Sequence, residues 1–128
     1  IADYWCHLGE FRLLVLRTAW RIDKYQDYMR VRKDISAVKA LMPKVLHDIA
    51  ERALHIHGSL GASLEMPYTD QLVLSYHMGL ADGPTEVHKV TVARQVLRDY
   101  EACTELFPAY HRPRAKAAAE AKYRHLLG

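Results

Sequence analysis

The spacing of apolar side chains over residues 2 to 29 constrains the fold of this chain more than any other feature of its sequence. Apolar or small side chains recur there every three or four positions, at Trp5, Leu8, Phe11, Leu14, Val15, Thr18, Ala19, Ile22 and Tyr25. This period predicts one long amphipathic helix. Leu13, Leu16 and Trp20 lie off that stripe, so we expect a second apolar face that packs against another helix or another subunit.

A second helix is predicted beyond the charged segment RVRKD, residues 30–34, which interrupts the apolar pattern. Either Asp34 or Ser36 is expected to cap its first turn, and Gly58 is expected to end it. Pro43 lies in the middle of this segment. Because proline removes a backbone donor and clashes with the preceding turn, we expect either a kink or a fresh helix start there.

The rest of the sequence predicts two further helices and a basic tail. After the small-residue loop GSLGASLEMP, a third helix is expected over residues 67–80 and a fourth over residues 84–107. No segment alternates with the period of a strand, so the chain is predicted to be all-α, an antiparallel helical bundle. We expect residues 1–107 to form this bundle and residues 108–128 to form a basic, Ala-rich tail, either a short helix or disordered.

Composition and charge exclude several classes of protein. The chain of 128 residues is 50% hydrophobic, which suffices for one folded domain, but no apolar run approaches the ~20 residues of a membrane span. The start, IADYWCHLGEF, lacks the features of a signal peptide and resembles the interior of a helix, so we expect a cytoplasmic chain cut from a longer one. A net charge of +3 without a basic, aromatic-rich stripe does not predict nucleic-acid binding.

The cysteines and histidines do not indicate a metal site. Cys6 and Cys103 lack metal-type spacing, and we expect buried thiols rather than a disulfide. His55 and His57 are two residues apart, a spacing that places side chains on nearly opposite faces of a helix. We therefore predict no metal ligands.

The stretch GLADGPTEVHK, residues 79–89, contains the most informative acidic residue. Judged on the chain alone, Asp82 is expected to cap the helix that Pro84 begins. The alternative is that Asp82 is a catalytic base at the edge of a pocket. The two roles are compatible, because a loop carboxylate in a resting enzyme can also cap a helix.

Two motifs set about 20 residues apart, ALHIHGSLGASLEMPY and LADGPTEVHKVTVAR, resemble the C-terminal helical domain of the acyl-CoA dehydrogenases. That family usually has Gln-Ile-x-Gly-Gly-x-Gly in the first motif and Glu-Gly-Thr before the last helix. More narrowly, ADGPTEVH and the proline of ISAVKALMPKV resemble the subgroup of acyl-CoA dehydrogenase family members 10 and 11. The resemblance covers residues 2 to 106 and implies that the first helix of the family's domain is missing here.

The resemblance implies a catalytic role for Asp82, which falls where the family carries its base. That base removes the proton α to the thioester while the β-hydride goes to FAD, and a carboxylate in a water-excluding pocket suits this task. Gly83 is implied to allow close approach of substrate and flavin. Pro84 and Glu86 are implied to begin the helix whose N-terminus, with its partial positive charge, faces the cofactor.

A second set of residues is implied to contact the adenine and pyrophosphate half of an FAD held by a neighbouring subunit. This set comprises His55, Gly58, Ser59 and Gly61, where small residues let backbone amides approach phosphate oxygens. His55 stands in place of the usual glutamine and Ser59 in place of a glycine. The usual Arg-Asp pair is replaced by Val73 and Leu74, which puts in doubt any salt bridge that braces this helix. On the chain alone, the two glycines equally predict a helix C-cap and turn.

The implied activity is the α,β-dehydrogenation of a fatty acyl-CoA by the full-length enzyme, with an electron-accepting flavoprotein as partner and a homo-oligomer, dimer or tetramer, as assembly. The present chain alone is expected neither to hold FAD tightly nor to turn over substrate, because the family's other domains are absent from it. The first alternative is a non-catalytic helical oligomerisation or partner-binding module. The second is a module that uses the basic tail to bind nucleic acid or an anionic surface.

Overall fold

The computed structural model describes residues 1–107 and 110–126, and every regular element within them is helical. The helices are α1 (Ala2–Tyr25), α2 (Tyr28–Gly61), α3 (Tyr68–Leu80), α4 (Thr85–Leu97) and α5 (Arg112–Tyr123), followed by the short 3₁₀ helix η1 (Arg124–Leu126). This architecture confirms the predicted all-α fold.

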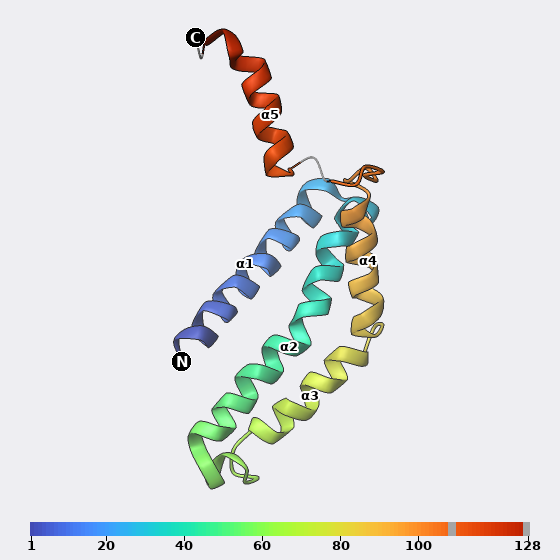
Figure 1. Ribbon diagram of the computed structural model, residues 1–128. Helices are drawn as coiled ribbons and strands as arrows, with labels where there is room; N and C mark the ends of the chain where they lie inside the picture. The colour runs from blue at the N-terminus through green and yellow to red at the C-terminus, as the bar shows by residue number, and fades with distance from the viewer. Residues whose placement is uncertain (108–109, 127–128) are drawn as a thin grey trace.

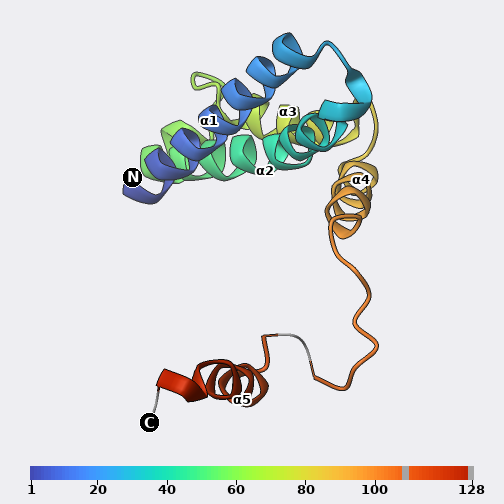
Figure 2. The same cartoon turned by 90° about the horizontal axis from the view of Figure 1, so that it is seen from above.

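Helix α2 is the centre of the bundle. It packs against α1 on one side and against α3 and α4 on the other (Figure 1). Helices α3 and α4 lie one after the other beside α2 and run in the opposite direction to it. The view from above shows the same arrangement, with α5 standing apart from the four bundle helices (Figure 2). Each bundle helix is therefore held mainly through its contact with α2.

The second helix begins earlier than predicted, because Asp27 caps it. Gln26 ends α1 in the left-handed conformation, with a φ of 48°. One carboxylate oxygen of Asp27 then accepts hydrogen bonds from the amides of Met29 (2.9 Å) and Arg30 (3.4 Å), which satisfies two of the free donors of the first turn. The charged segment 30–34 thus continues a helix instead of interrupting one.

Asp34 and Ser36, the predicted caps, are instead buried inside α2. Asp34 is 5% exposed and forms ion pairs with Arg17 (3.0 Å) and Arg21 (3.1 Å) of α1. A buried carboxylate requires such partners, because an isolated buried charge is strongly unfavourable. The prediction that either residue caps the helix was wrong: this part of the charged run joins α1 to α2.

Helix α2 also continues through Pro43, so the expected fresh start does not occur. Its backbone angles leave the helical range only at Gly58, with φ 58° and ψ −136°, and the kink predicted at Pro43 is not seen in those angles. The proline ring lies against Gly79 of α3, where a hypothetical Cβ would be 3.8 Å from ring carbons. The glycine thus leaves room for the ring beside α3, and α2 continues through the proline with helical backbone angles.

Helix α4 ends at Leu97 and not near residue 107 as predicted. Only a turn follows, closed by hydrogen bonds from the amides of Asp99 to Val96 and of Tyr100 to Leu97 (3.1 and 3.2 Å). The side chains of Leu97 and Tyr100 are exposed. Because a helix gains most of its stability from burying one face, little favours continuing α4 past this point.

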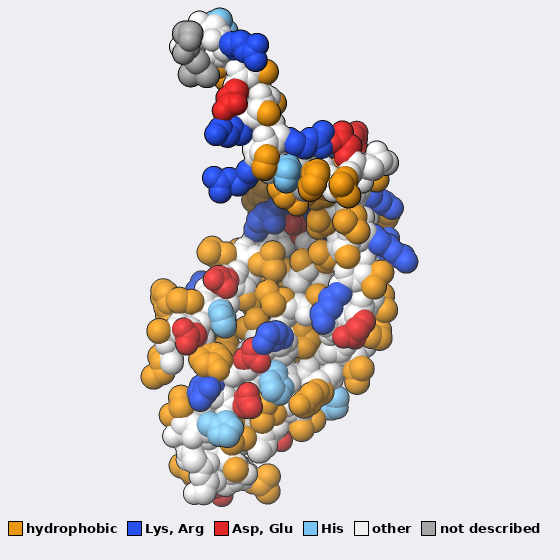
Figure 3. Space-filling view, viewed as in Figure 1, with side chains coloured by type: hydrophobic (Ala, Val, Ile, Leu, Met, Phe, Trp, Pro, Cys, Tyr) orange, Lys and Arg blue, Asp and Glu red, His pale blue; other side chains and the backbone are white. Residues whose placement is uncertain are grey.

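Large apolar side chains remain uncovered over much of the bundle. Val31 and Ala50 are 1% exposed, whereas Trp5 and Trp20 of α1 are 77% and 55% exposed, and hydrophobic side chains spread across the face in Figure 3. The predicted second apolar face of α1, with Leu13 and Leu16, is exposed as well. Patches of this kind mark surfaces that bind another protein surface.

Two further findings concern the cysteines and the membrane. Cys6 and Cys103 are free thiols, as expected, but both are exposed, so the prediction of buried thiols was wrong. Cys6 lies in the first turns of α1 and Cys103 in the segment after α4. None of the helices within residues 1–107 and 110–126 is both long and apolar enough to cross a bilayer.

Candidate functional site

The turn between α3 and α4 holds Asp82 in an uncommon conformation. Asp82 has a φ of 55° and Gly83 a φ of 107°, two successive positive values. Aspartate is among the few residues that tolerate a positive φ, whereas a value of 107° strongly favours glycine. Non-glycine residues held in this region are often found at functional sites.

The carboxylate of Asp82 does not cap α4. Pro84 occupies the N-cap position, and no side chain accepts a hydrogen bond from the first-turn amides. The amides of Val87 and His88 bond instead to the carbonyl of Pro84 (3.0 and 3.4 Å). The capping interpretation of Asp82 was therefore wrong for this structure, since its φ of 55° belongs to a turn residue preceding the cap.

Three side chains bond to backbone carbonyls at the end of α3 and in the turn. The ammonium of Lys39 in α2 donates to the carbonyl of Met78 (2.8 Å), the hydroxyl of Thr85 donates to that of Gly79 (3.2 Å), and Nε2 of His88 donates to that of Asp82 (3.3 Å). The last carbonyls of a helix lack intrahelical partners. These donors therefore fasten the turn to α2 and to the first two turns of α4.

The surroundings of Asp82 are open. An apolar groove of about 450 Å³ runs between α2 and the α3–α4 junction; its lining includes Pro43, Ser75, Tyr76, Gly79, Thr85 and Lys89. Asp82 itself is exposed and does not line the groove. Glu86 is also exposed and pairs with Lys89 at 3.7 Å. The contacts to the carbonyls of Met78, Gly79 and Asp82 hold the backbone of the turn, and the carboxylate of Asp82 stays exposed to water.

The second predicted set lies at the far end of α2. Gly58 breaks the helix with its positive φ of 58°, and its carbonyl accepts from the amide of Ala62 (3.3 Å). Gly61 is buried, and a Cβ there would lie 2.3 Å from the carbonyl oxygen of Leu54. Its glycine character is therefore explained by packing within the chain. His55 and Ser59 are exposed, so they are accessible to a partner surface.

His57 links this end of α2 to the start of α3. Its Nδ1 donates a hydrogen bond to the carbonyl of Ala53 (2.8 Å), and its Nε2 lies 3.4 Å from the hydroxyl of Tyr68. The two rings are 4.9 Å apart between centroids. This contact fixes the loop that follows Gly58 against α3.

The structure does not bring the two predicted sets together. The 13 residues of α3 separate them, a helix length of about 20 Å at 1.5 Å per residue. His55, Gly58, Ser59 and Gly61 form one end of the bundle, whereas Asp82, Gly83, Pro84 and Glu86 lie at the α3–α4 junction. They are therefore two separate surfaces of the bundle.

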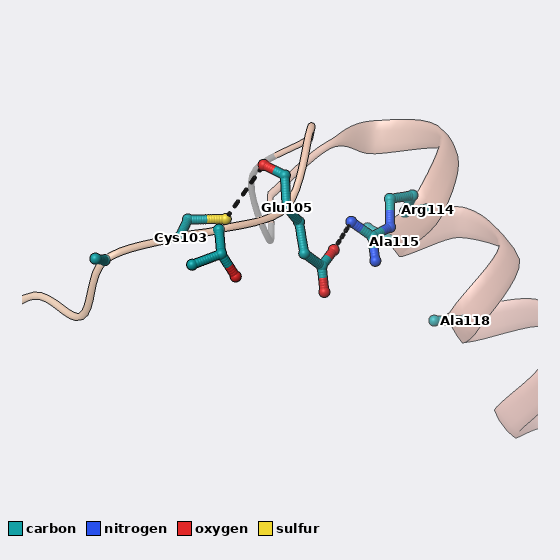
Figure 4. A pocket seen from close by; sticks show the side chains of 7 residues that line it. Cys103, Glu105, Arg114, Ala115 and Ala118 are labelled. Carbon is teal, nitrogen blue, oxygen red and sulfur yellow. Dashed lines mark hydrogen bonds and ion pairs between the residues drawn. The ribbon is translucent and has the colours of Figure 1, made fainter.

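A further pocket of about 430 Å³ lies outside both sets, between the segment after α4 and α5. Cys103 and Glu105 line it from one side and Arg114 from the other, with an ion pair between Glu105 and Arg114 (Figure 4). Among the described residues, no three or more His, Cys, Asp or Glu side chains group in a way that could hold a metal ion.

Sequence reasoning missed the residues that hold the Asp82 turn: Lys39, Thr85 and His88. Thr85 and His88 stand within the quoted motif GLADGPTEVHK, three residues apart and so on one face of α4. That spacing was the available signal. The contact from Lys39 spans 39 residues and has no local signature.

Comparison with known proteins identifies the domain. The family model of the acyl-CoA dehydrogenase C-terminal domain matches residues 1–97. Acyl-CoA dehydrogenase family member 11 from Rattus norvegicus is 38% identical over 92 residues, 72% of this chain and 12% of that protein. Acyl-CoA dehydrogenase family member 10 from Mus musculus is 31% identical over 98 residues, 77% of this chain and 9% of that protein.

A solved structure of an acyl-CoA dehydrogenase homologue from Mycobacterium abscessus matches with a TM-score of 0.74 and 35% identity, over 78% of this chain and 24% of that one. The chain therefore spans a minor part of each of these relatives. The matches confirm the resemblance inferred from the two glycine-containing motifs, including its similarity to family members 10 and 11. In sequence and in fold, this chain belongs to the acyl-CoA dehydrogenase family and corresponds to its C-terminal domain.

Proposed function

We propose that this chain is the C-terminal part of an FAD-dependent acyl-CoA dehydrogenase in which Asp82 is the catalytic base. The observation that carries this proposal is the turn itself: Asp82 is held at a φ of 55°, is exposed, and is not used as a helix cap. A carboxylate fixed in this way is available to a substrate. In this role one carboxylate oxygen accepts the proton from the carbon α to the thioester, and Asp82 becomes a neutral carboxylic acid.

The chain's residues fit a flavin cofactor at two places. Bound FAD would supply the acceptor for the β-hydride. Gly83 leaves the turn without a side chain, and Pro84 and Glu86 begin α4, whose N-terminal partial positive charge favours electron-rich groups. At the other surface, exposed His55 and Ser59 with Gly58 leave backbone and side-chain donors accessible to the phosphates of an FAD held by a neighbouring subunit.

The proposal extends to assembly and organisation. The exposed apolar face of α1 favours a homo-oligomer, dimer or tetramer. Residues 1–107 are proposed as the functional bundle and residues 108–128 as an accessory basic tail. An acyl-CoA substrate, an electron-accepting flavoprotein and a cytoplasmic location complete the proposal. Since Asp82 is exposed here, this chain alone is proposed to be inactive.

Replacement of Asp82 by asparagine in the full-length protein tests the proposal. Asp82→Asn keeps the shape and removes the base, so acyl-CoA-dependent flavin reduction should slow by about 10²- to 10⁴-fold, with FAD content unchanged. Asp70→Asn is the matched control, because Asp70 is an exposed carboxylate in the first turn of α3. Equal rates for the two variants would refute the assignment of Asp82.

The second candidate function is a non-catalytic oligomerisation or partner-binding module, favoured by the exposed apolar side chains of α1. It predicts that the full-length protein binds its partner equally well with and without Asp82. It also predicts that no acyl-CoA reduces its flavin. Flavin bleaching on addition of an acyl-CoA would exclude this alternative.

A further inference from the structure

The Asp82–Gly83 peptide is the most easily rearranged part of the candidate site. Its orientation is set by ψ of Asp82 and φ of Gly83, and glycine has access to both signs of φ at little cost. Rotation of this peptide turns the Asp82 carbonyl and leaves the Asp82 Cβ in place, whereas an uncompensated change of either angle alters how the backbone runs from Asp82 into α4. The turn therefore needs a contact that selects one of the available conformations.

His88 makes that contact. Its Nε2 donates to the Asp82 carbonyl at 3.3 Å, and the same nitrogen would be 3.2 Å from a Cβ on Gly83. The ring thus lies directly against this peptide, in space that the glycine leaves open. Thr85, three residues earlier on the same face of α4, bonds to the carbonyl of Gly79 and holds the other side of the turn.

We propose that His88 is a positioning residue that fixes the Asp82–Gly83 peptide and thereby keeps Asp82, and the carboxylate it carries, at one place relative to α4. This inference rests on the proposed function of Asp82. Nε2 carries a hydrogen both in one neutral tautomer and in the charged imidazole, so the contact requires a donor and no particular charge. Neighbouring Glu86 and Lys89 pair with one another and are not needed for it.

The test is a set of His88 variants in the full-length protein, followed by acyl-CoA-dependent flavin reduction. His88→Phe keeps a ring but removes the donor, and it should lower kcat by about tenfold to a hundredfold, the size of effect that a misplacement of about 1 Å produces. KM and FAD content should change less than about threefold. His88→Gln, which retains an N–H donor, should recover most of the lost rate, and His7→Phe, an exposed histidine of α1, should behave as the unmodified protein.

A double-mutant cycle with Asp82→Asn separates this proposal from the one on which it rests. If His88 acts through Asp82, His88→Phe has no further effect on kcat in the Asp82→Asn background. An unchanged rate in Asp82→Asn would overturn the proposed base and the positioning role together. Two outcomes would overturn the positioning role alone, given that Asp82→Asn loses activity. One is a normal kcat in His88→Phe, and the other is a loss of kcat on His88→Phe that is equally large in the unmodified protein and in Asp82→Asn.

Discussion

Replacing Gly61 by alanine should destabilise the bundle, although alanine is the better helix former. Gly61 is buried in the last turn of α2, where a Cβ would lie 2.3 Å from the carbonyl oxygen of Leu54 and 3.0 Å from Cβ of His57. The carbonyl is backbone and cannot rotate away, so the turn that follows Gly58 would have to move by roughly an ångström. Forced overpacking costs about 1–3 kcal/mol and alanine regains about 1 kcal/mol of helix propensity, so we expect a net loss of up to about 2 kcal/mol.

The measurement is urea unfolding followed by far-ultraviolet circular dichroism, at one fixed protein concentration because association would add apparent stability. Gly9→Ala is the matched control. Gly9 lies inside α1 with nothing within 4 Å of a hypothetical Cβ, so alanine there should raise the free energy of unfolding by about 0.5–1 kcal/mol. If Gly61→Ala stabilised the chain as Gly9→Ala does, the steric explanation of Gly61 would be refuted, and glycine there would need a reason from outside the chain.

Three further substitutions test other contacts. Asp34→Asn should lower the free energy of unfolding by about 1–2 kcal/mol, because it removes the charged partner of Arg17 and Arg21, whose side chains are 57% and 25% exposed and so keep part of their hydration. Lys44→Met should raise the pKa of Asp48, which the hydrogen bond from Lys44 lowers, and NMR titration of the carboxyl measures it. A carboxyl whose pKa is lowered in the folded state stabilises that state at pH values above its ordinary pKa, and this stabilisation is lost as the pH falls through the folded-state pKa. The free energies of unfolding of the two proteins should therefore converge at acid pH. Gly58→Ala should cost about 1–3 kcal/mol through backbone strain alone, because nothing lies within 4 Å of its hypothetical Cβ.

The helices that the sequence predicted well are those whose limits are local. The α3 helix was expected over residues 67–80 and spans Tyr68–Leu80, since Pro67 and the Gly79–Pro84 turn punctuate it. The start of α2 was predicted too late because a run of charges resembles a solvated linker. Whether Asp34 is solvated or buried depends on arginines 13 and 17 positions earlier, and no local pattern contains that information.

In the candidate site, too, the features set by consecutive residues were predicted and those set by contacts between distant residues were not. Asp82 was identified through a motif of consecutive residues, and the structure places it in the expected turn. Its conformation and the donor from His88 were not foreseen, because a contact over six residues arises only when the backbone reverses with a positive φ. Gly61 was assigned to cofactor approach through the resemblance of its loop to the family motif, whereas its tight contact with Leu54 follows the break at Gly58.

Positioning and desolvation of the candidate base have different physical origins in this protein. Lys39, Thr85 and His88 hold the turn through hydrogen bonds to backbone carbonyls, yet Asp82 remains exposed. A base that removes a proton next to a thioester works best where water is excluded. If Asp82 is that base, the exclusion must come from surfaces that close over the turn, and the contacts described here keep the carboxylate in place for them. Substitutions in the turn should therefore change kcat with little effect on assembly, whereas substitutions on the exposed face of α1 should change assembly first.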